Sequence, residues 1–255
     1  MKVRILGCSG GIGGRHLRTT SILVDHDILI DAGTGVGDLS IAELAQIDHL
    51  FITHTHLDHI ACLPFMVDTV GDMRSAPLTV YATEAVIEIL RNHIFNWAIW
   101  PDFTEIPNAS QPFMRFQTIR KDEPTILGER SITALPANHT VPAVGYALAT
   151  EQAALVFTGD TTVCPELWER INRIPNLRYL LIECAFSDRE MKLAQSSKHL
   201  CPAMLAEELN NLQREVPLFI THLKPGQIEL TMLEIEERIG EYKPRMLQSN
   251  QVFEL

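Results

Sequence analysis

The chain has 255 residues and a formal net charge of −11 at pH 7; 46% of its residues are hydrophobic and 21% are charged. This composition is typical of a globular fold, and no apolar run reaches the roughly 18 residues of a membrane-spanning helix. An acidic chain lacks the broad basic surface that follows a nucleic-acid backbone, so we expect neither a nucleic-acid partner nor a membrane. The N-terminus carries no segment of signal-peptide length, and a cytoplasmic location is the expectation.

The cysteines are scattered along the chain and include no Cys-x-x-Cys pair. They are Cys8, Cys62, Cys164, Cys184 and Cys201. An odd number at wide spacing argues against a disulfide framework and against a four-cysteine zinc site. We expect all five to be small buried side chains.

The first half of the chain alternates short strands with helices. Strands are expected at Val3–Leu6, Ser21–Val24, Ile28–Ile30, Asp48–Ile52, Pro77–Tyr81 and Phe113–Ile119. Helices are expected at Asp38–Ala45, Ile60–Val70 and Glu84–His93. Each strand is a short run of apolar and β-branched residues bounded by turn residues.

The second half repeats this alternation. Strands are expected at Ile132–Leu135, Val144–Leu148, Leu155–Phe157, Arg178–Ile182, Leu218–Ile220 and near Met246. Helices are expected at Pro165–Ile171, Pro202–Arg214 and Glu229–Ile239. Two strand-rich halves, each finished by helices, predict two stacked sheets with helices outside, in one domain spanning residues 1–255.

Residues 94–112 lack clear periodicity and are rich in aromatic side chains. Trp97, Trp100 and Phe103 stand close together beside prolines. Two interpretations stay open: a loop that buries its rings under the domain, or a lid or partner-facing surface. In the second interpretation the rings seal a pocket, stack on a purine or form a homodimer contact.

Four potential metal ligands fall within six residues, directly after the strand expected at Asp48–Ile52. They are His54, His56, Asp58 and His59. Buried histidine and aspartate are costly without a partner, and a cation supplies one. His54 and His56 alternate in near-extended chain, so they can converge on one cation. Asp58 and His59 then face a second position.

Three further polar residues follow expected strands in the same way. They are His139, Asp160 and His222. Each would stand at the C-terminal edge of its strand, where a sheet can aim it at the histidine cluster. We therefore expect these three side chains to complete a site for two metals.

A glycine-rich segment, Gly7–Gly13, follows the first strand, as does the dinucleotide-binding loop of short-chain dehydrogenases. That interpretation requires a helix next, but an alternating strand pattern follows, and no Tyr-x-x-x-Lys pair exists. We expect these glycines instead to let the backbone pass close to the metal site or its ligand.

The order His-x-His-x-Asp-His, His, Gly-Asp-Thr and a final His resembles the metallo-β-lactamase superfamily, from Gly7 to about Leu223. The resemblance implies an α/β fold, namely an αβ/βα four-layer sandwich whose two mixed sheets pack face to face with helices outside. It also implies two zinc ions at one edge of the sandwich, with Mn²⁺ or Fe²⁺ as substitutes.

The same resemblance implies a division of the ligands between the ions. One ion would be held by His54, His56 and His139. The other would be held by Asp58, His59 and His222, and Asp160 would bridge the two. Sulfur is absent from this set, which suits a hard oxyanion substrate.

Four segments resemble the class II cyclic-nucleotide phosphodiesterases. They are Phe51–Ile60, Ile94–Pro101, Leu193–Leu200 and Ile220–Pro225. The resemblance implies hydrolysis of the small molecules cAMP or cGMP to 5′-monophosphates by a hydroxide held between two zinc ions. Phe157–Asp160 is closer to the ribonuclease Z branch.

Three alternatives stay open. One is a ribonuclease Z-like endonuclease that processes tRNA 3′ ends, and another is a glyoxalase-II-like thioesterase or lactonase on the same dimetal site. The third is a non-catalytic scaffold, which a complete ligand set argues against.

Resemblance to ribonuclease Z also implies roles for His199 and Glu183. A histidine with a pKa of about 6.5 suits protonation of a departing sugar oxygen, and a carboxylate on its far nitrogen keeps the ring oriented. His199 would be the general acid and Glu183 its partner; with Asp58 they are the expected catalytic residues. The alternative is that His199 ends the helix before Pro202, and that Glu183 is a buried strand-end carboxylate.

Overall fold

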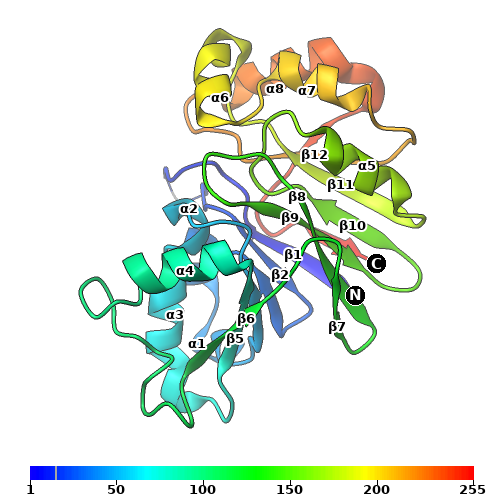
Figure 1. The fold of residues 1–255 in the computed structure, drawn as a ribbon. Helices are drawn as coiled ribbons and strands as arrows, with labels where there is room; N and C mark the ends of the chain where they lie inside the picture. Colours follow the sequence, from blue (N-terminus) through cyan, green and yellow to red (C-terminus); the bar gives the residue numbers. More distant parts are fainter. Residues whose placement is uncertain (15) are drawn as a thin grey trace.

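The computed structural model describes residues 1–14 and 16–255. Two seven-stranded sheets lie face to face between layers of helices (Figure 1). In order across the first sheet are β14 (Val252–Glu254), β1 (Lys2–Gly7), β2 (Ser21–Val24), β3 (Ile28–Ile30), β4 (His49–Phe51), β5 (Leu78–Ala82) and β6 (Met114–Thr118). The second runs β13 (Arg245–Met246), β12 (Leu218–Thr221), β11 (Leu177–Glu183), β10 (Ala154–Phe157), β9 (Val144–Ala149), β8 (Arg130–Pro136) and β7 (Pro124–Leu127).

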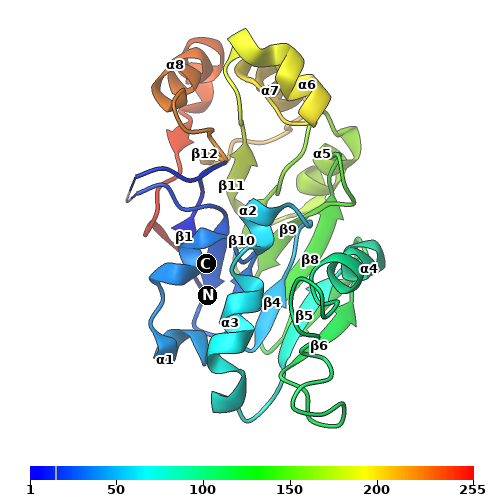
Figure 2. The same cartoon turned by 90° about the vertical axis from the view of Figure 1, so that its left-hand side faces the viewer.

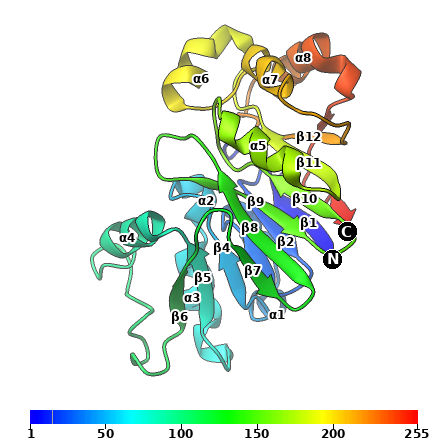
Figure 3. The ribbon, with the colours of Figure 1, turned by 45° about the vertical axis from the view of Figure 1, so that its right-hand side comes forward.

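The helices cover the two outer faces, which Figure 3 shows in side view. The first sheet carries α1 (Ile41–Leu44), α2 (Leu57–Ile60), α3 (Leu63–Val70) and α4 (Glu84–His93). The second carries α5 (Pro165–Arg173), α6 (Met191–Ser197), α7 (Pro202–Leu209) and α8 (Ile228–Ile239). The expected four-layer α/β sandwich is confirmed. No described helix is long and apolar enough to cross a membrane.

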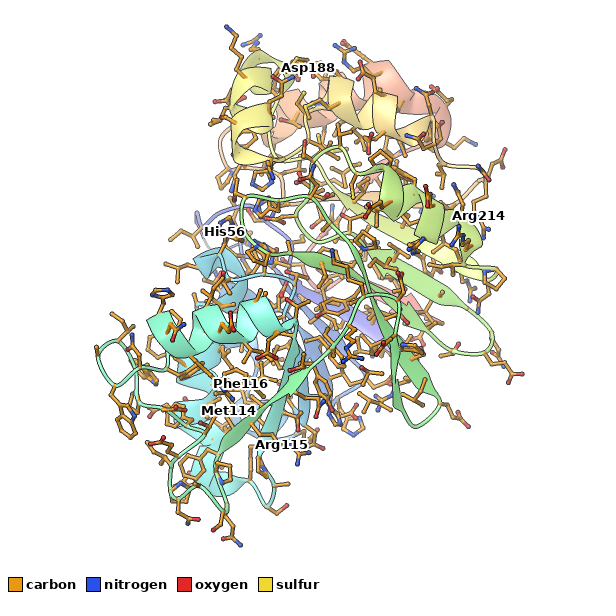
Figure 4. The ribbon with its side chains drawn as sticks, viewed as in Figure 1. His56, Met114, Arg115, Phe116, Asp188 and Arg214 are labelled. Atoms are coloured by element: carbon orange, nitrogen blue, oxygen red, sulfur yellow. The ribbon has the colours of Figure 1, made fainter. Side chains whose placement is uncertain are left out.

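Alternation along the strands divides the interior into three cores. On β3, Ile28 and Ile30 face the second sheet, whereas Leu29 faces the helices of the first. On β6, Met114 and Phe116 pack toward α4, while Arg115 reaches the neighbouring strand β5 from the opposite face (Figure 4). A period of two places successive side chains on opposite faces, so each sheet is apolar on both sides.

Parallel pairing brings the functional loops to one edge. Strands β3 to β6 are mutually parallel, as are β10 to β13. The carboxyl ends of parallel strands meet at the same side of a sheet, where the loops that follow them converge. Figure 2 views this edge, with α2 in front and α6 and α7 above it. In Figure 1 the chain termini lie on the other side of the molecule from α2.

Helix boundaries differ from expectation at three places. The segment expected as one helix from Asp38 is a 3-10 turn, Thr34–Asp38, followed by α1. α2 begins at Leu57, inside the ligand motif and three residues before the expected start at Ile60. α7 ends at Leu209 rather than at Arg214. The Asn211 side chain donates to the Glu208 carbonyl oxygen, which would accept a backbone N–H in a longer helix.

Candidate metal centre

The loop after β4 brings two histidines to the sheet edge. β4 ends at Phe51, and the chain passes through Ile52 and Thr53 into the fully buried His54. His56 follows in extended conformation, directly before α2, at the edge of the sheet (Figure 4). The two imidazole rings meet edge to face with centroids 4.8 Å apart. The two side chains thus converge, as the alternation predicted.

Helix α2 holds the other half of the motif. Asp58 and His59 belong to its single turn, and the His59 ring stacks on His222 with centroids 5.5 Å apart. Asp58 Oδ2 lies 3.7 Å from His222 Nε2. His222 directly follows β12 and has a φ of +61°. A non-glycine residue in this left-handed region is strained, and such strain is typical of functional sites.

Asp160 occupies the middle of the cluster. Its Oδ2 lies 3.6 Å from His54 Nε2, and its Oδ1 lies 3.4 Å from His59 Nε2 and 3.2 Å from His222 Nδ1. His139 reaches the same place from the loop after β8, with its Nε2 3.1 Å from His56 Nδ1.

The potential ligand atoms fall into three groups, and within each group they lie within 4.8 Å of one another. The first comprises His54, His56, His139 and Asp160, the second comprises Asp58, His59 and His222, and the third, which overlaps both, comprises Asp160, His199 and His222. The structure thus brings together all seven side chains that the sequence analysis selected. This grouping depends on the distances between strand ends, which no local sequence pattern determines.

The chemistry of the cluster fits divalent cations. Four of its buried polar atoms have no hydrogen-bond partner in the described part of the chain, namely His54 Nε2, His59 Nε2, Asp160 Oδ1 and His222 Nδ1. Burial lowers the pKa of the His54 and His222 imidazoles, and that of His139 to about 4. Neutral imidazoles keep a free lone pair, and imidazole with carboxylate is the set that zinc binds.

Asp31 is a functional residue that the sequence analysis missed. It is fully buried, with a φ of +57°, and its Oδ2 lies 2.7 Å from His59 Nδ1. Thr53 donates to the same carboxylate through both its backbone N–H and its hydroxyl. A carboxylate on the far nitrogen of a histidine fixes the tautomer and the ring orientation. The available signal was its place directly after β3, matching the other strand-end residues.

His199 and Glu183 form a buried pair beside the cluster. His199 Nδ1 lies 2.8 Å from Glu183 Oε1, and the same carboxylate accepts the backbone N–H of Thr161 and of Leu200. The His199 ring stacks on His222 with centroids 5.1 Å apart. Burial lowers the pKa of His199, but the charge and hydrogen bond of Glu183 outweigh it, so the pKa is raised above its ordinary value.

Two glycines allow the backbone to pass against the ligands. A Cβ on Gly10 would lie 2.4 Å from the His222 carbonyl oxygen, and one on Gly33 would lie 2.4 Å from that of Asp58. Neither position has room for a side chain. Gly10 of the N-terminal glycine-rich segment therefore packs against the cluster, and the described residues between this segment and β2 form no helix.

Comparison with known proteins agrees with this geometry. A family model described as a β-lactamase superfamily domain matches residues 26–223. The chain belongs to the metallo-β-lactamase superfamily. A probable 3′,5′-cyclic-nucleotide phosphodiesterase of Yersinia pestis is 25% identical over 278 residues, covering 88% of this chain and 78% of that protein.

Two further proteins are similar to this chain. Ribonuclease Z of Clostridium beijerinckii is 25% identical and covers 80% of this chain and 68% of its own length. The crystal structure of unliganded yeast PDE1 has a TM-score of 0.80 at 20% identity, covering 100% of this chain and 99% of that one. At this identity the structural likeness shows the shared fold.

The aromatic segment of this superfamily member divides into buried and exposed rings. Phe103 is buried and packs near Phe95, and Trp100 packs edge to face on Phe65 with centroids 5.2 Å apart. Trp97 is 60% exposed, with Ile99 exposed beside it. Phe103 therefore follows the buried-loop interpretation and is not available to stack on a purine. A homodimer contact through Trp97 stays a prediction.

Proposed function

We propose that this metallo-β-lactamase-fold hydrolase is a dimetal phosphodiesterase that opens 3′,5′-cyclic nucleotides to 5′-monophosphates. The observation that carries the proposal is the convergence of seven ligand side chains, without sulfur, beside a histidine–carboxylate pair. Hydrolysis of a phosphodiester needs a water made nucleophilic, stabilised phosphoryl oxygens and an acid for the leaving oxygen.

The ligand groups suggest how two divalent ions, zinc in our proposal, would be held. His54, His56 and His139 would bind one, Asp58, His59 and His222 the other, and Asp160, near members of both groups, would bridge them. Two divalent ions held side by side lower the pKa of a shared water and stabilise both the attacking and the leaving oxygen.

His199 is proposed to protonate the departing 3′ oxygen. Its Nδ1 is engaged by Glu183, which leaves Nε2 free to donate a proton. Its ring lies between His139 and His222, with centroids 4.9 Å and 5.1 Å away. Glu183 would hold the ring in place and favour its protonated form. Asp58, whose Oδ2 lies 3.7 Å from His222 Nε2, would orient the attacking water besides holding its ion.

A ribonuclease Z-like activity is the second candidate, favoured by the 25% identity to the Clostridium beijerinckii enzyme. The net charge of −11 argues against it, because tRNA binding depends on a basic surface. The match to the Yersinia pestis protein covers a larger share of both chains than the ribonuclease Z match does, and it supports the cyclic-nucleotide substrate.

One assay separates the candidates. Zinc-loaded protein is incubated with cAMP, cGMP, a precursor tRNA and a neutral thioester, with the Asp160→Asn variant as the inactive control. We expect 5′-AMP or 5′-GMP from the wild type and a loss of at least about a hundredfold in the variant, since both ion sites lose a ligand. Cleavage of the tRNA or the thioester alone would refute the cyclic-nucleotide proposal.

A further inference from the structure

Lys224 places an ammonium group at the rim of the metal centre. It lies two residues after His222, and its Nζ is 3.5 Å from His222 Nε2. The glycine-rich loop holds it there, because Lys224 Nζ donates to the Gly10 carbonyl oxygen at 2.6 Å. Its backbone N–H donates to Ala185, in the loop that follows Glu183. Both ends of this residue are thus fixed against elements of the site.

Among the described residues, no carboxylate forms an ion pair with this ammonium. Its firm acceptor is a neutral carbonyl. An ammonium has three N–H donors; one goes to the Gly10 carbonyl oxygen and one faces His222 Nε2, which leaves one for a ligand, or two when His222 Nε2 binds an ion.

The second lysine beside the cluster is used differently. Lys198 Nζ donates to two acceptors, Asn138 Oδ1 and the His139 carbonyl oxygen, each at 3.1 Å. The Lys198 carbonyl oxygen in turn accepts from His139 Nδ1 at 3.0 Å. Lys198 therefore braces the loop that carries His139, whereas Lys224 has free donors at the rim.

Charge balance indicates what the free donors bind. The carboxylates of Asp58 and Asp160, with those of Asp31 and Glu183 behind the histidines, carry four negative charges that offset two divalent ions, and Lys224 then leaves an excess of positive charge. Such a centre has a positive field that attracts an anion and gives a neutral ester no equivalent gain. An ammonium fixed beside it repels the ions unless an anionic group lies between them.

We propose that Lys224 is a specificity residue that binds a non-bridging oxygen of an anionic phosphodiester and so selects it over neutral esters, thioesters and lactones. This inference rests on the proposed function. A charge-assisted hydrogen bond to a phosphoryl oxygen is worth a factor of about 10 to 100 in binding. If Lys224 only held the Gly10 loop against His222, its replacement would instead affect all substrates equally.

The test compares Lys224→Met, Lys224→Arg and, as matched control, Lys2→Met in zinc-loaded protein. Lys2 is exposed at the start of β1, at the opposite end of that strand from Gly7, where the glycine-rich loop begins. Binding of 5′-AMP is measured by calorimetry, cAMP hydrolysis by kcat/KM, and zinc content by elemental analysis. We expect Lys224→Met to lower AMP affinity and kcat/KM by about 10- to 100-fold with zinc content unchanged. Lys224→Arg should keep most of both, and Lys2→Met should match the wild type.

Two outcomes overturn the assignment. If Lys224→Met binds AMP as tightly as the wild type, Lys224 does not contact the phosphate. If both Lys224 variants lose zinc or thermal stability in parallel with their affinity for AMP, Lys224 has a structural role instead. Either result leaves the phosphodiesterase proposal standing if the wild type hydrolyses cAMP. A wild type that binds AMP but cleaves no cyclic nucleotide refutes the proposed function instead.

Discussion

At the scale of single residues, His199 and the proposed ligand His59 have matching contacts, since each places Nδ1 on a buried carboxylate and stacks on His222; our proposal makes His199 the general acid rather than a further ligand. Its Nδ1 contacts Glu183, and its free face stacks on His222. The His199→Ala variant should therefore lower kcat by about 10²- to 10⁴-fold, the usual contribution of a general acid, while zinc content stays at the wild-type value. Steady-state kinetics and elemental analysis check this; loss of zinc would reassign His199 to a structural role.

Asp31 acts on the cluster through another side chain. Its carboxylate holds His59 Nδ1 at 2.7 Å, so it orients the nitrogen on the far side of the ring. In Asp31→Asn we expect zinc affinity to fall by about 10- to 100-fold, as is usual when the orienting partner of a ligand is removed. Competition with a chelating dye measures this affinity, and an unchanged value would contradict the role. Asp68→Asn is a control on α3, away from the cluster.

At the scale of elements, α1 shows how four residues form a helix far from the cluster. Ser40 and Glu43 form a capping box, in which the Ser40 hydroxyl accepts the Glu43 N–H and the Glu43 carboxylate accepts the Ser40 N–H. Arg4 of β1 also contacts Glu43 at 2.8 Å. These hydrogen bonds lower the pKa of Glu43 to about 2, and the one from the Ser40 backbone N–H contributes most.

The lowered pKa of Glu43 predicts a pH-dependent part of the stability. A depressed carboxyl pKa stabilises the fold above the unfolded value of about 4.5, and this contribution disappears as the pH falls toward about 2. Glu43→Gln should lower the free energy of unfolding at pH 7 by under about 1 kcal/mol, because solvent screens the exposed carboxylate. The difference from wild type should narrow between pH 5 and pH 3 in thermal unfolding; a constant difference would contradict the prediction.

At the scale of the whole molecule, the cluster joins segments from both sheets. His54 and His59 follow β4 of the first sheet, whereas His139, Asp160 and His222 follow strands of the second. Ions bound there would connect the two sheets at their common edge. Bound ions would also relieve the four buried atoms that lack partners.

Metal removal should therefore destabilise the protein. A ligand that binds only the native state adds about 2.7 kcal/mol at a hundred times its dissociation constant. We expect chelator-treated protein to unfold at a lower temperature, and added zinc to raise the transition temperature again with the logarithm of its free concentration. Differential scanning calorimetry measures this. Identical transitions with and without zinc would refute a native-state metal site.

Local patterns were sufficient for much of the molecule. Most strands and helices lie within a few residues of their expected ranges, because a period of two and the turn residues are written in neighbouring positions. The exceptions have different causes. β14 pairs with β1 from the other end of the chain, β7 is an exposed hairpin strand with a weak apolar pattern, and α6 is a short helix with one buried residue, Ala194.

The chemistry of the ligands was readable from residue type and spacing, since histidine and aspartate keep their donor atoms in any fold. The meeting of His54 with Asp160, the support of His59 by Asp31 and the approach of Lys224 to His222 needed the tertiary structure. These contacts join residues from separate strands, and only the packing of the two sheets sets the distances between them.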